Sequence, residues 1–383
     1  MSDFTHDVIC LSHLRWGFVF QRPNHLMSRC AAERRVYFVE EPVLHEAPPE
    51  LRITRAQPNL TVITPQLTVG TAGPRVESVQ RRMLAAFARD EGVRAPVLWF
   101  YTPMALPLAA DLAPSLIVYD CMDELAAFHG APAILRYRES ELFSRAHLVF
   151  TGGHSLYEAK RARHPSVHAF PSSVDAAHFG RALTAQEPVA QRRIAGPRVG
   201  FFGVIDERMD LELVAALADA RPSYQIVMLG PVVKISPDSL PKRPNLHWLG
   251  ARPYEELPAW IAGWDVAMMP FALNDATRFI SPTKTLEYLA AGRPVVSTAI
   301  RDVVRPYGER GLVRIADRAS FARAVDEALA CDLERHRREA RQLLARTSWD
   351  ETWRQMSRLI TEAATMYAPP AIEIEEAPSC STI

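Results

Sequence analysis

The segment SPTKTLEYLAAGRPVVST, residues 281–298, combines hydroxyl, ammonium and carboxylate side chains at helical spacing. Thr283, Lys284 and Thr285 would lie in the first turn of a helix, where free backbone amides carry partial positive charge. Glu287 would share a face with Thr283, about 5 to 6 Å away. A diphosphate suits the first group and a ribose diol suits the carboxylate. The alternative is an ordinary capped helix that happens to carry a lysine and a glutamate.

The limits of this helix are predicted by its end residues. Ser281 suits the N-cap and Pro282 the first helical position, while Gly292 suits the left-handed position after the last turn. Pro294 prevents the helix from continuing into the next apolar run. Apolar runs on both sides place the start of the helix at the carboxyl edge of a parallel sheet, where open α/β folds bind ligands.

Short apolar runs alternate with amphipathic stretches along most of the chain, which is typical of βα units with buried parallel strands. The predicted strands of the first series are 7–12, 35–40, 97–101, 116–120, 147–150 and 167–171, and those of the second are 198–203, 224–230, 246–250, 265–271, 294–298 and 312–315. We therefore predict an α/β protein with two Rossmann-like, doubly wound lobes and a cleft between them. The predicted boundaries are a first lobe at 1–180, a linker at 181–197, a second lobe at 198–345, a helix at 346–367 that packs back on the first lobe, and a disordered tail at 368–383.

The length, charge balance and cysteine content of the chain limit the classes of function that it can have. The 383 residues exceed what one core usually supports, and 44 basic residues balance 44 acidic ones, so no overall field favours nucleic acid. The five cysteines are scattered, without a CxxC pair, and predict neither a disulfide framework nor a zinc site. The polar start and the lack of a long apolar run predict a cytoplasmic protein.

Several landmarks occur in a recognisable order: GFFGVIDERMDLELVAALA, then YQIVMLGP, then NLHWLGARPYEELPAWIAGWDVAMMPF, and finally the 281–298 helix. With them the second lobe resembles the donor lobe of the GT-B glycosyltransferases. The similarity is greatest to the large retaining family, of family 4 or group 1 type, that includes bacterial cell-surface polysaccharide transferases. The resemblance covers roughly residues 7–367.

The resemblance implies roles for further residues of the second lobe. Gly250, Ala251 and Arg252 would border the nucleotide base through largely backbone contacts. Arg208 would meet the diphosphate, with Gly203 allowing close backbone approach. An ion pair between Arg208 and a neighbouring aspartate is the alternative.

Two positions depart from the family pattern. Many members carry two glutamates eight positions apart, the first touching the donor sugar and the second the ribose. Glu287 matches the second, whereas Phe279 occupies the first position. Val204 stands where an arginine is common.

The loop after the first predicted strand supplies candidates for the acceptor side of the cleft. Trp16 could stack on a sugar face, and Gly17 permits close approach of a ligand. Arg22 or His25 could meet an anionic group, although a histidine that packs a helix is an equal alternative for His25.

Carboxylates follow a later strand of the first lobe. Asp120, Asp123 and Glu124 would lie just beyond the strand 116–120 and could orient or deprotonate an acceptor hydroxyl. N-capping of the next helix by Asp120 or Asp123 is the alternative. His154, after two glycines, would also border the cleft.

The sequence contains no DxD motif, so we expect no metal and no tightly bound cofactor, with Lys284 and Arg208 offsetting leaving-group charge. The basic segment 335–346 presents either a solvated face or a peripheral contact with anionic lipid at the inner face of the membrane.

Together these features predict a hexosyltransferase that moves a sugar from a nucleoside diphosphate sugar to a glycan or lipid-linked acceptor, with retention of configuration, in cell-surface polysaccharide biosynthesis. The catalytic candidates are Asp120, Asp123, Arg208 and Lys284. Two other functions are open: a nucleotide-sugar epimerase of the same architecture, and a non-catalytic nucleotide-sugar-binding protein.

Overall fold

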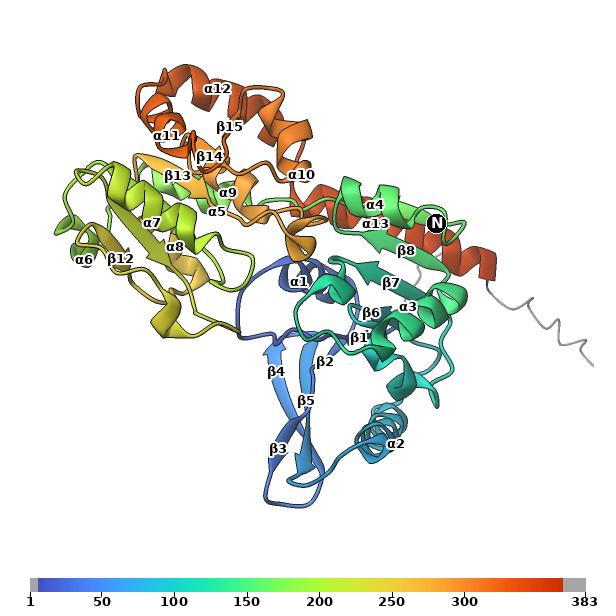
Figure 1. The fold of residues 1–383 in the computed structure, drawn as a ribbon. Coiled ribbons are helices and arrows are strands. Elements are labelled where there is room, and N and C mark those ends of the chain that lie inside the picture. The colour runs from blue at the N-terminus through green and yellow to red at the C-terminus, as the bar shows by residue number, and fades with distance from the viewer. Residues whose placement is uncertain (1–5, 368–383) are drawn as a thin grey trace, which may run out of the picture.

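The computed structural model describes residues 6–367, which form two α/β lobes (Figure 1). The predicted tail at 368–383 lies outside the described residues. Each lobe is built on a parallel sheet, with helices packed against it. This arrangement confirms the predicted fold class, because runs of buried apolar residues alternate with amphipathic helices as βα units require.

The first lobe contains a nine-stranded sheet in the order β3-β5-β2-β1-β6-β7-β8-β9, with β4 antiparallel to β5. Its strands are β1 (Val8–Leu11), β2 (Val36–Val39), β3 (Val43–His45), β4 (Glu50–Gln57), β5 (Leu60–Thr68), β6 (Val97–Phe100), β7 (Leu116–Cys121), β8 (Leu148–Thr151) and β9 (Val167–Ala169). Its helices are α1 (Arg22–Glu33), α2 (Pro74–Asp90), α3 (Ile134–Arg145) and α4 (His154–Lys160).

The strands β3, β4 and β5 are absent from the sequence prediction. They project from the first lobe, away from the second (Figure 1). Most residues of β4 are exposed on both faces, and β5 contains Pro65, so neither strand shows the continuous apolar run of the other strands.

The second lobe contains a six-stranded parallel sheet in the order β12-β11-β10-β13-β14-β15. Its strands are β10 (Arg198–Phe202), β11 (Gln225–Leu229), β12 (Leu246–Trp248), β13 (Val266–Met269), β14 (Val295–Ser297) and β15 (Val313–Ile315). Its helices are α5 (Ala176–Gly180), α6 (Val189–Arg192), α7 (Leu211–Ala220), α8 (Leu257–Ala262), α9 (Thr283–Ala290), α10 (Arg301–Val303), α11 (Phe321–Leu329) and α12 (Leu333–Leu344). The strand order reverses between β10 and β13, which opens a crevice at their carboxyl ends.

The chain passes between the lobes earlier than the predicted linker at 181–197. Phe179 and Ala182 are buried in the core of the second lobe, and the side-chain amide of the buried Gln191 donates to the carbonyl of Trp260 there. The segment therefore folds onto the second lobe, because its apolar residues are buried in that core.

The last helix, α13 (Trp349–Tyr367), returns to the first lobe (Figure 1). Trp349, Trp353, Met356 and Ile360 are buried in the same core cluster as strands β1 and β6. The helix thus adds a second physical connection between the lobes.

The described part of the chain has two further properties. Within residues 6–367, no helix has the length and apolar character needed to cross a bilayer. Cys10, Cys30, Cys121 and Cys331 are free thiols, and the first three are buried.

Candidate active site

A cleft of about 530 Å³ lies between the lobes, a size suited to a small organic ligand. Loops that follow β1, β10, β11 and β13 line it, together with the first turns of α9. The predicted residues in its lining are Trp16, Gly17, Arg22, Asp123, Gly203, Arg208, Ala251, Arg252, Ser281, Thr283, Lys284 and Glu287. The crevice expected from the strand order is therefore open to a ligand.

The α9 helix begins one residue later than the sequence predicted. Thr283 is its first residue and Pro282, with an extended ψ of 119°, is the N-cap. Ser281 instead contacts the first lobe: its hydroxyl accepts from the Ser172 amide at 3.3 Å, and its carbonyl accepts from the Ser172 hydroxyl at 2.5 Å. Ser281 therefore joins the two walls of the cleft rather than capping the helix.

Lys284 lies in the first turn of α9 against the end of β10. Its ammonium is 5.7 Å from the centre of the Phe202 ring. Burial lowers the pKa of Lys284, and the nearby Glu287 carboxylate opposes this shift. The position brings an ammonium group to the amino end of α9, where backbone amides also favour negative charge.

Glu287 lies one turn beyond Thr283, and its side chain is 5% exposed. Burial raises the pKa of Glu287 to about 7, while Lys284 and a hydrogen bond from the Thr283 side chain act in the opposite direction. Among residues 6–367, no group satisfies the Glu287 Oε2 atom. A buried carboxylate oxygen without a partner is costly, so this atom is ready to accept a hydrogen bond from a ligand.

Thr285 and Gly250 do not have the predicted contact with the cleft. Thr285 is fully buried, and its hydroxyl lies 3.4 Å from the Met269 sulfur, so it faces the sheet rather than a phosphate. Gly250 is exposed and lies outside the cleft lining, and its carbonyl accepts from the amide of Gly230, which does line the cleft, at 2.9 Å.

Arg208 forms the ion pair that the sequence offered as the alternative, and it also lines the cleft. Two nitrogens of its guanidinium donate to the buried Asp206 carboxylate, with the shortest contact at 2.7 Å. The centre of the guanidinium lies 5.6 Å from the Phe128 ring of the first lobe. Asp206 therefore orients a cation at the seam between the lobes.

Arg252 lines the part of the cleft near β11 and β12. Its guanidinium lies 4.7 Å above the Trp260 ring, a favourable cation–π geometry. Its Nε atom is buried and has no hydrogen-bond partner in the described chain. The Arg252 side chain, and not only the backbone expected here, is therefore available to a ligand.

The first-lobe residues differ in how far they reach into the cleft. Trp16 lines the cleft, but its ring packs edge-on against Phe38 at 5.1 Å.

Arg22 binds Asp120 through two nitrogens, the shorter contact at 2.9 Å, and Asp120 is fully buried. Asp120 therefore cannot contact an acceptor, and its strand-end position reflects a structural ion pair. Arg22 is 3% exposed and committed to that pair, which leaves little of it for an anionic ligand.

The two candidate histidines lie outside the cleft lining. His25 stacks on Trp349 at 4.7 Å with an interplanar angle of 12°, and burial lowers its pKa to about 3. It is the packing histidine that the sequence allowed as an alternative. His154 begins α4 and lines a separate hollow with Asp302 of the second lobe. Gly153 serves this contact, because a Cβ there would lie 2.2 Å from the Asp302 Oδ2 atom.

Asp123 is the first-lobe carboxylate that reaches the cleft. Burial raises the pKa of Asp123 to about 6, while the guanidinium groups of Arg208 and Arg22 act in the opposite direction. A carboxyl with a pKa near neutrality can exchange a proton with an acceptor hydroxyl.

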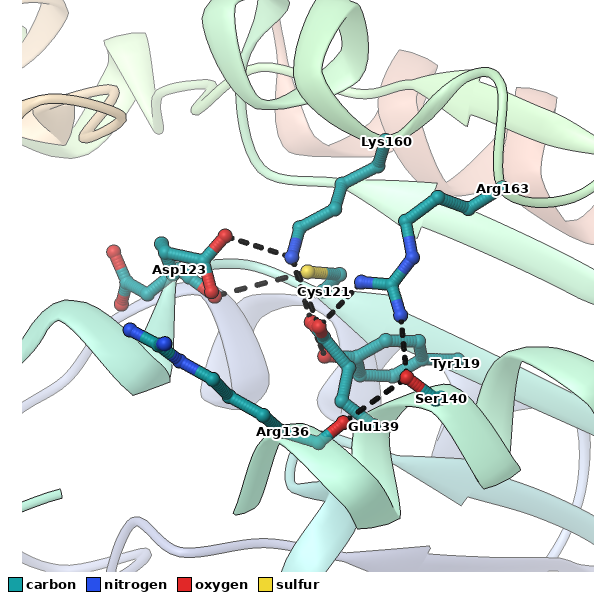
Figure 2. A network of polar contacts seen from close by, with 9 residues as sticks. Tyr119, Cys121, Asp123, Arg136, Glu139, Ser140, Lys160 and Arg163 are labelled. Atoms are coloured by element: carbon teal, nitrogen blue, oxygen red, sulfur yellow. Dashed lines mark hydrogen bonds and ion pairs between the residues drawn. The ribbon is translucent and has the colours of Figure 1, made fainter. Parts of the chain in front are cut away.

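A buried ion cluster supports the loop that carries Asp123 (Figure 2). The Lys160 ammonium contacts Glu124 at 2.7 Å and Glu139 at 2.8 Å, and Arg163 contacts Glu139 at 2.6 Å. Lys160 and Glu139 are each 5% exposed. Since Glu124 follows Asp123 directly, α4 ties down the cleft carboxylate through this cluster.

Tyr254 is a cleft residue that the sequence prediction missed. It lines the cleft beside Arg252, and its hydroxyl is buried with no hydrogen-bond partner among residues 6–367. A tyrosine after the LGARP segment carries no motif of its own. Only the structure shows that its ring meets residues from both lobes, Phe20 and His178.

The two residues that depart from the family pattern, Val204 and Phe279, lie in different parts of the structure. Val204 lines the cleft beside Gly203. Phe279 packs against the core of the first lobe, and the Arg278 guanidinium lies 5.2 Å from its ring. The aromatic side chain thus serves the contact between the lobes where a glutamate would contact a sugar.

Comparison with known proteins agrees with this geometry. Residues 196–331 match the family model described as glycosyl transferases group 1. Over 282 residues, the chain is 24% identical to the putative teichuronic acid biosynthesis glycosyltransferase TuaH of Bacillus subtilis (strain 168), covering 68% of this chain and 70% of that protein.

Solved structures show the same fold. A sucrose-phosphate synthase from Thermosynechococcus elongatus superposes with a TM-score of 0.69 at 15% identity, over 94% of this chain and 100% of that one. An α,α-trehalose-phosphate synthase (UDP-forming) from Burkholderia xenovorans, in complex with glucose-6-phosphate, has a TM-score of 0.67 at 12% identity, over 94% and 99% of the two chains.

Fold, cleft and family match together define a glycosyltransferase with the GT-B fold, whose second lobe contains a group 1 glycosyltransferase domain.

Proposed function

We propose that this enzyme transfers a hexose unit from a nucleoside diphosphate sugar to a glycan or lipid-linked acceptor, with retention of configuration. The observation that carries the proposal is the first turn of α9, where Lys284 and free backbone amides face a cleft that also contains the unsatisfied Glu287 carboxylate. These groups match a diphosphate and a ribose diol at the spacing of one helical turn.

In this reaction the bond between the anomeric carbon and the diphosphate oxygen breaks, and its electron pair passes to the diphosphate. Lys284, Arg208 and the α9 amides offset the developing negative charge. The acceptor hydroxyl forms the new bond to the anomeric carbon, and its proton passes to Asp123 or to the departing diphosphate. Loops from both lobes surround the reacting atoms and exclude water.

The acceptor class is supported by the similarity to TuaH, whose name places it in teichuronic acid biosynthesis. A polymer or a lipid-linked glycan is consistent with a cleft that opens between two lobes. Two arginines of α12 pair with glutamates of the same helix, Arg335 with Glu339 at 2.8 Å and Arg337 with Glu334 at 3.0 Å, which favours a solvated face there.

The first test is a thermal-shift screen against UDP, GDP, ADP, dTDP and their sugars, since a ligand of the native state raises its melting temperature. The proposal expects a selective shift with one nucleotide. Transfer from the corresponding nucleotide sugar, followed by proton NMR of the product, then gives the anomeric configuration. The absence of any shift, or a product formed without an acceptor, would contradict the proposal.

A further inference from the structure

The loop between β7 and α3, residues 122–133, reaches from the first lobe to the second. Its Phe128 ring meets two cations of the second lobe: the centre of the ring lies 5.6 Å from the Arg208 guanidinium and 5.2 Å from the Lys234 ammonium. Both distances are within the range of a cation–π contact. Next to the ring, the His129 amide donates to the Glu207 Oε1 atom at 3.2 Å. The tip of this loop therefore bridges the two lobes.

The base of the same loop is fixed within the first lobe. Glu124 contacts the buried Lys160 ammonium at 2.7 Å. Between the base and the tip, the turn Leu125–Ala127 lies against Asp275–Thr277 of the second lobe. Asp123, which lines the cleft, stands at the base of the loop. The loop thus links the position of this carboxylate to the contact between the lobes.

The Phe128 ring gives Arg208 a contact that its ion pair does not provide. Asp206 accepts from the Nε and Nη2 atoms of Arg208, but it belongs to the same loop of the second lobe and moves with it. The ring lies in the first lobe and fixes the guanidinium relative to the other wall of the cleft. Within residues 6–367, the Arg208 Nη1 atom donates to no protein atom, so it is free to meet a ligand in the cleft.

An aromatic ring can hold two cations without neutralising either of them. Lys234 is exposed and forms no ion pair with another described residue. Its φ of +63° is uncommon for a residue with a side chain and costs free energy. The negative face of the Phe128 ring attracts both charges. A carboxylate in its place would compete with a donor diphosphate for the Arg208 guanidinium.

We propose that Phe128 is a positioning residue, whose ring holds Arg208 and Lys234 against the first lobe when the lobes close over the donor. The proposal rests on the proposed function and extends it to the contact that assembles the site. Arg208 then meets the negative charge that develops on the diphosphate from a fixed position relative to Asp123. Since this charge is greatest in the transition state, loss of the ring should slow the transfer step more than it weakens donor binding.

The test compares the transfer kinetics of the wild type, Phe128→Leu and Phe128→Trp. Leucine keeps an apolar side chain but removes the π face, whereas tryptophan restores the π face that attracts cations most strongly. The control is Tyr137→Leu, which removes an aromatic ring that is 68% exposed on α3 and is not among the described residues that line the cleft. The melting temperature of each variant shows whether it remains folded.

We expect Phe128→Leu to lower kcat by about tenfold, with the donor KM within about threefold of wild type and the melting temperature unchanged. Phe128→Trp should keep kcat within about threefold of wild type. Tyr137→Leu should match the wild type. In an Arg208→Gln background, Phe128→Leu should lower kcat by less than about twofold, because the ring acts through the guanidinium.

Three results would overturn the proposal and leave the proposed function intact. These are an unchanged kcat in Phe128→Leu, an equal loss of kcat in Phe128→Trp, and a full tenfold loss when Phe128→Leu is added to Arg208→Gln. A wild-type protein that transfers no sugar would overturn the proposed function, and this proposal with it.

Discussion

A methyl group on Gly203 would lie 2.1 Å from the Cε atom of Lys284, so the glycine at the end of β10 and the lysine at the start of α9 occupy adjoining space. Gly203 also has a φ of +141°, which L side chains rarely adopt. The approach of the lysine to the cleft therefore depends on the absence of a side chain on the neighbouring loop.

We predict that Gly203→Ala displaces the Lys284 ammonium and lowers turnover by about 100-fold, the effect of losing one group that stabilises the leaving charge. The backbone conformation adds about 1 to 3 kcal/mol of destabilisation. The matched control is Gly17→Ala, on the opposite wall of the cleft, where an added Cβ has no neighbour within 4 Å among the described residues. Similar turnover for the two variants would show that the position of Lys284 does not depend on the absence of a side chain at Gly203.

Glu287 gives the folded protein a predictable pH dependence. The pKa of Glu287 is raised from 4.5 to about 7, so the folded state holds a proton that the unfolded chain has already lost. The stabilisation from this proton is complete below the unfolded pKa and disappears as the pH rises through about 7. The free energy of unfolding of Glu287→Gln relative to wild type should therefore rise by about 3 kcal/mol between pH 4.5 and pH 8. Urea denaturation at both pH values measures the difference, and a constant difference would refute the assignment.

The same group should control binding of the donor. The ionised carboxylate accepts hydrogen bonds from the ribose, so affinity should fall up to tenfold per pH unit below about 7 and level off above it. Nucleotide sugars are the right ligands, because the esterified diphosphate does not titrate near neutrality. Calorimetry at several pH values should show this slope in the wild type and a flat profile in Glu287→Gln. If the affinity of Glu287→Gln still falls at low pH, the pH dependence belongs to another group.

Lys160 should contribute to stability as the centre of a buried ion cluster. Lys160→Met leaves Glu124 without its ammonium partner, and Glu139 retains only Arg163 and the Tyr119 hydroxyl. We predict a loss of about 3 kcal/mol in the free energy of unfolding, since breaking a buried pair leaves an uncompensated charge. Arg145→Met removes an exposed partner of Glu141 and should cost less than about 1 kcal/mol. Equal small losses in both would show that the cluster is energetically neutral.

Features encoded by contiguous residues were predictable from the sequence. The apolar runs placed the six strands of the second sheet, and Gly292, with a φ of +68°, follows the last turn of α9 as its residue type indicates. Strand β4 escaped prediction because most of its side chains are exposed, and β5, although mostly buried, interrupts its apolar residues with threonines and Pro65. The pattern of apolar residues predicts a strand where the strand is regularly buried, and it does not predict one where burial is irregular.

The direction of individual side chains was less predictable. Asp120 and Asp123 stand three positions apart, yet one is sealed in an ion pair with Arg22 and the other faces the cleft. Thr283 and Thr285 divide in the same way between the ligand side and the core. Tyr254 depends on rings contributed by distant segments of the chain. These side-chain directions are set by tertiary packing, which the spacing of residues in the sequence does not reveal.

The central claim is that the first turn of α9 binds a nucleoside diphosphate, and calorimetric titration of wild type and Lys284→Met tests it most directly. The nucleoside diphosphate with the largest thermal shift is compared with its parent nucleoside. We predict that the variant binds the diphosphate about 100-fold more weakly, with little change for the nucleoside, because only the charge contact is lost. Equal diphosphate affinity in the two proteins, or no binding to either, would contradict the account.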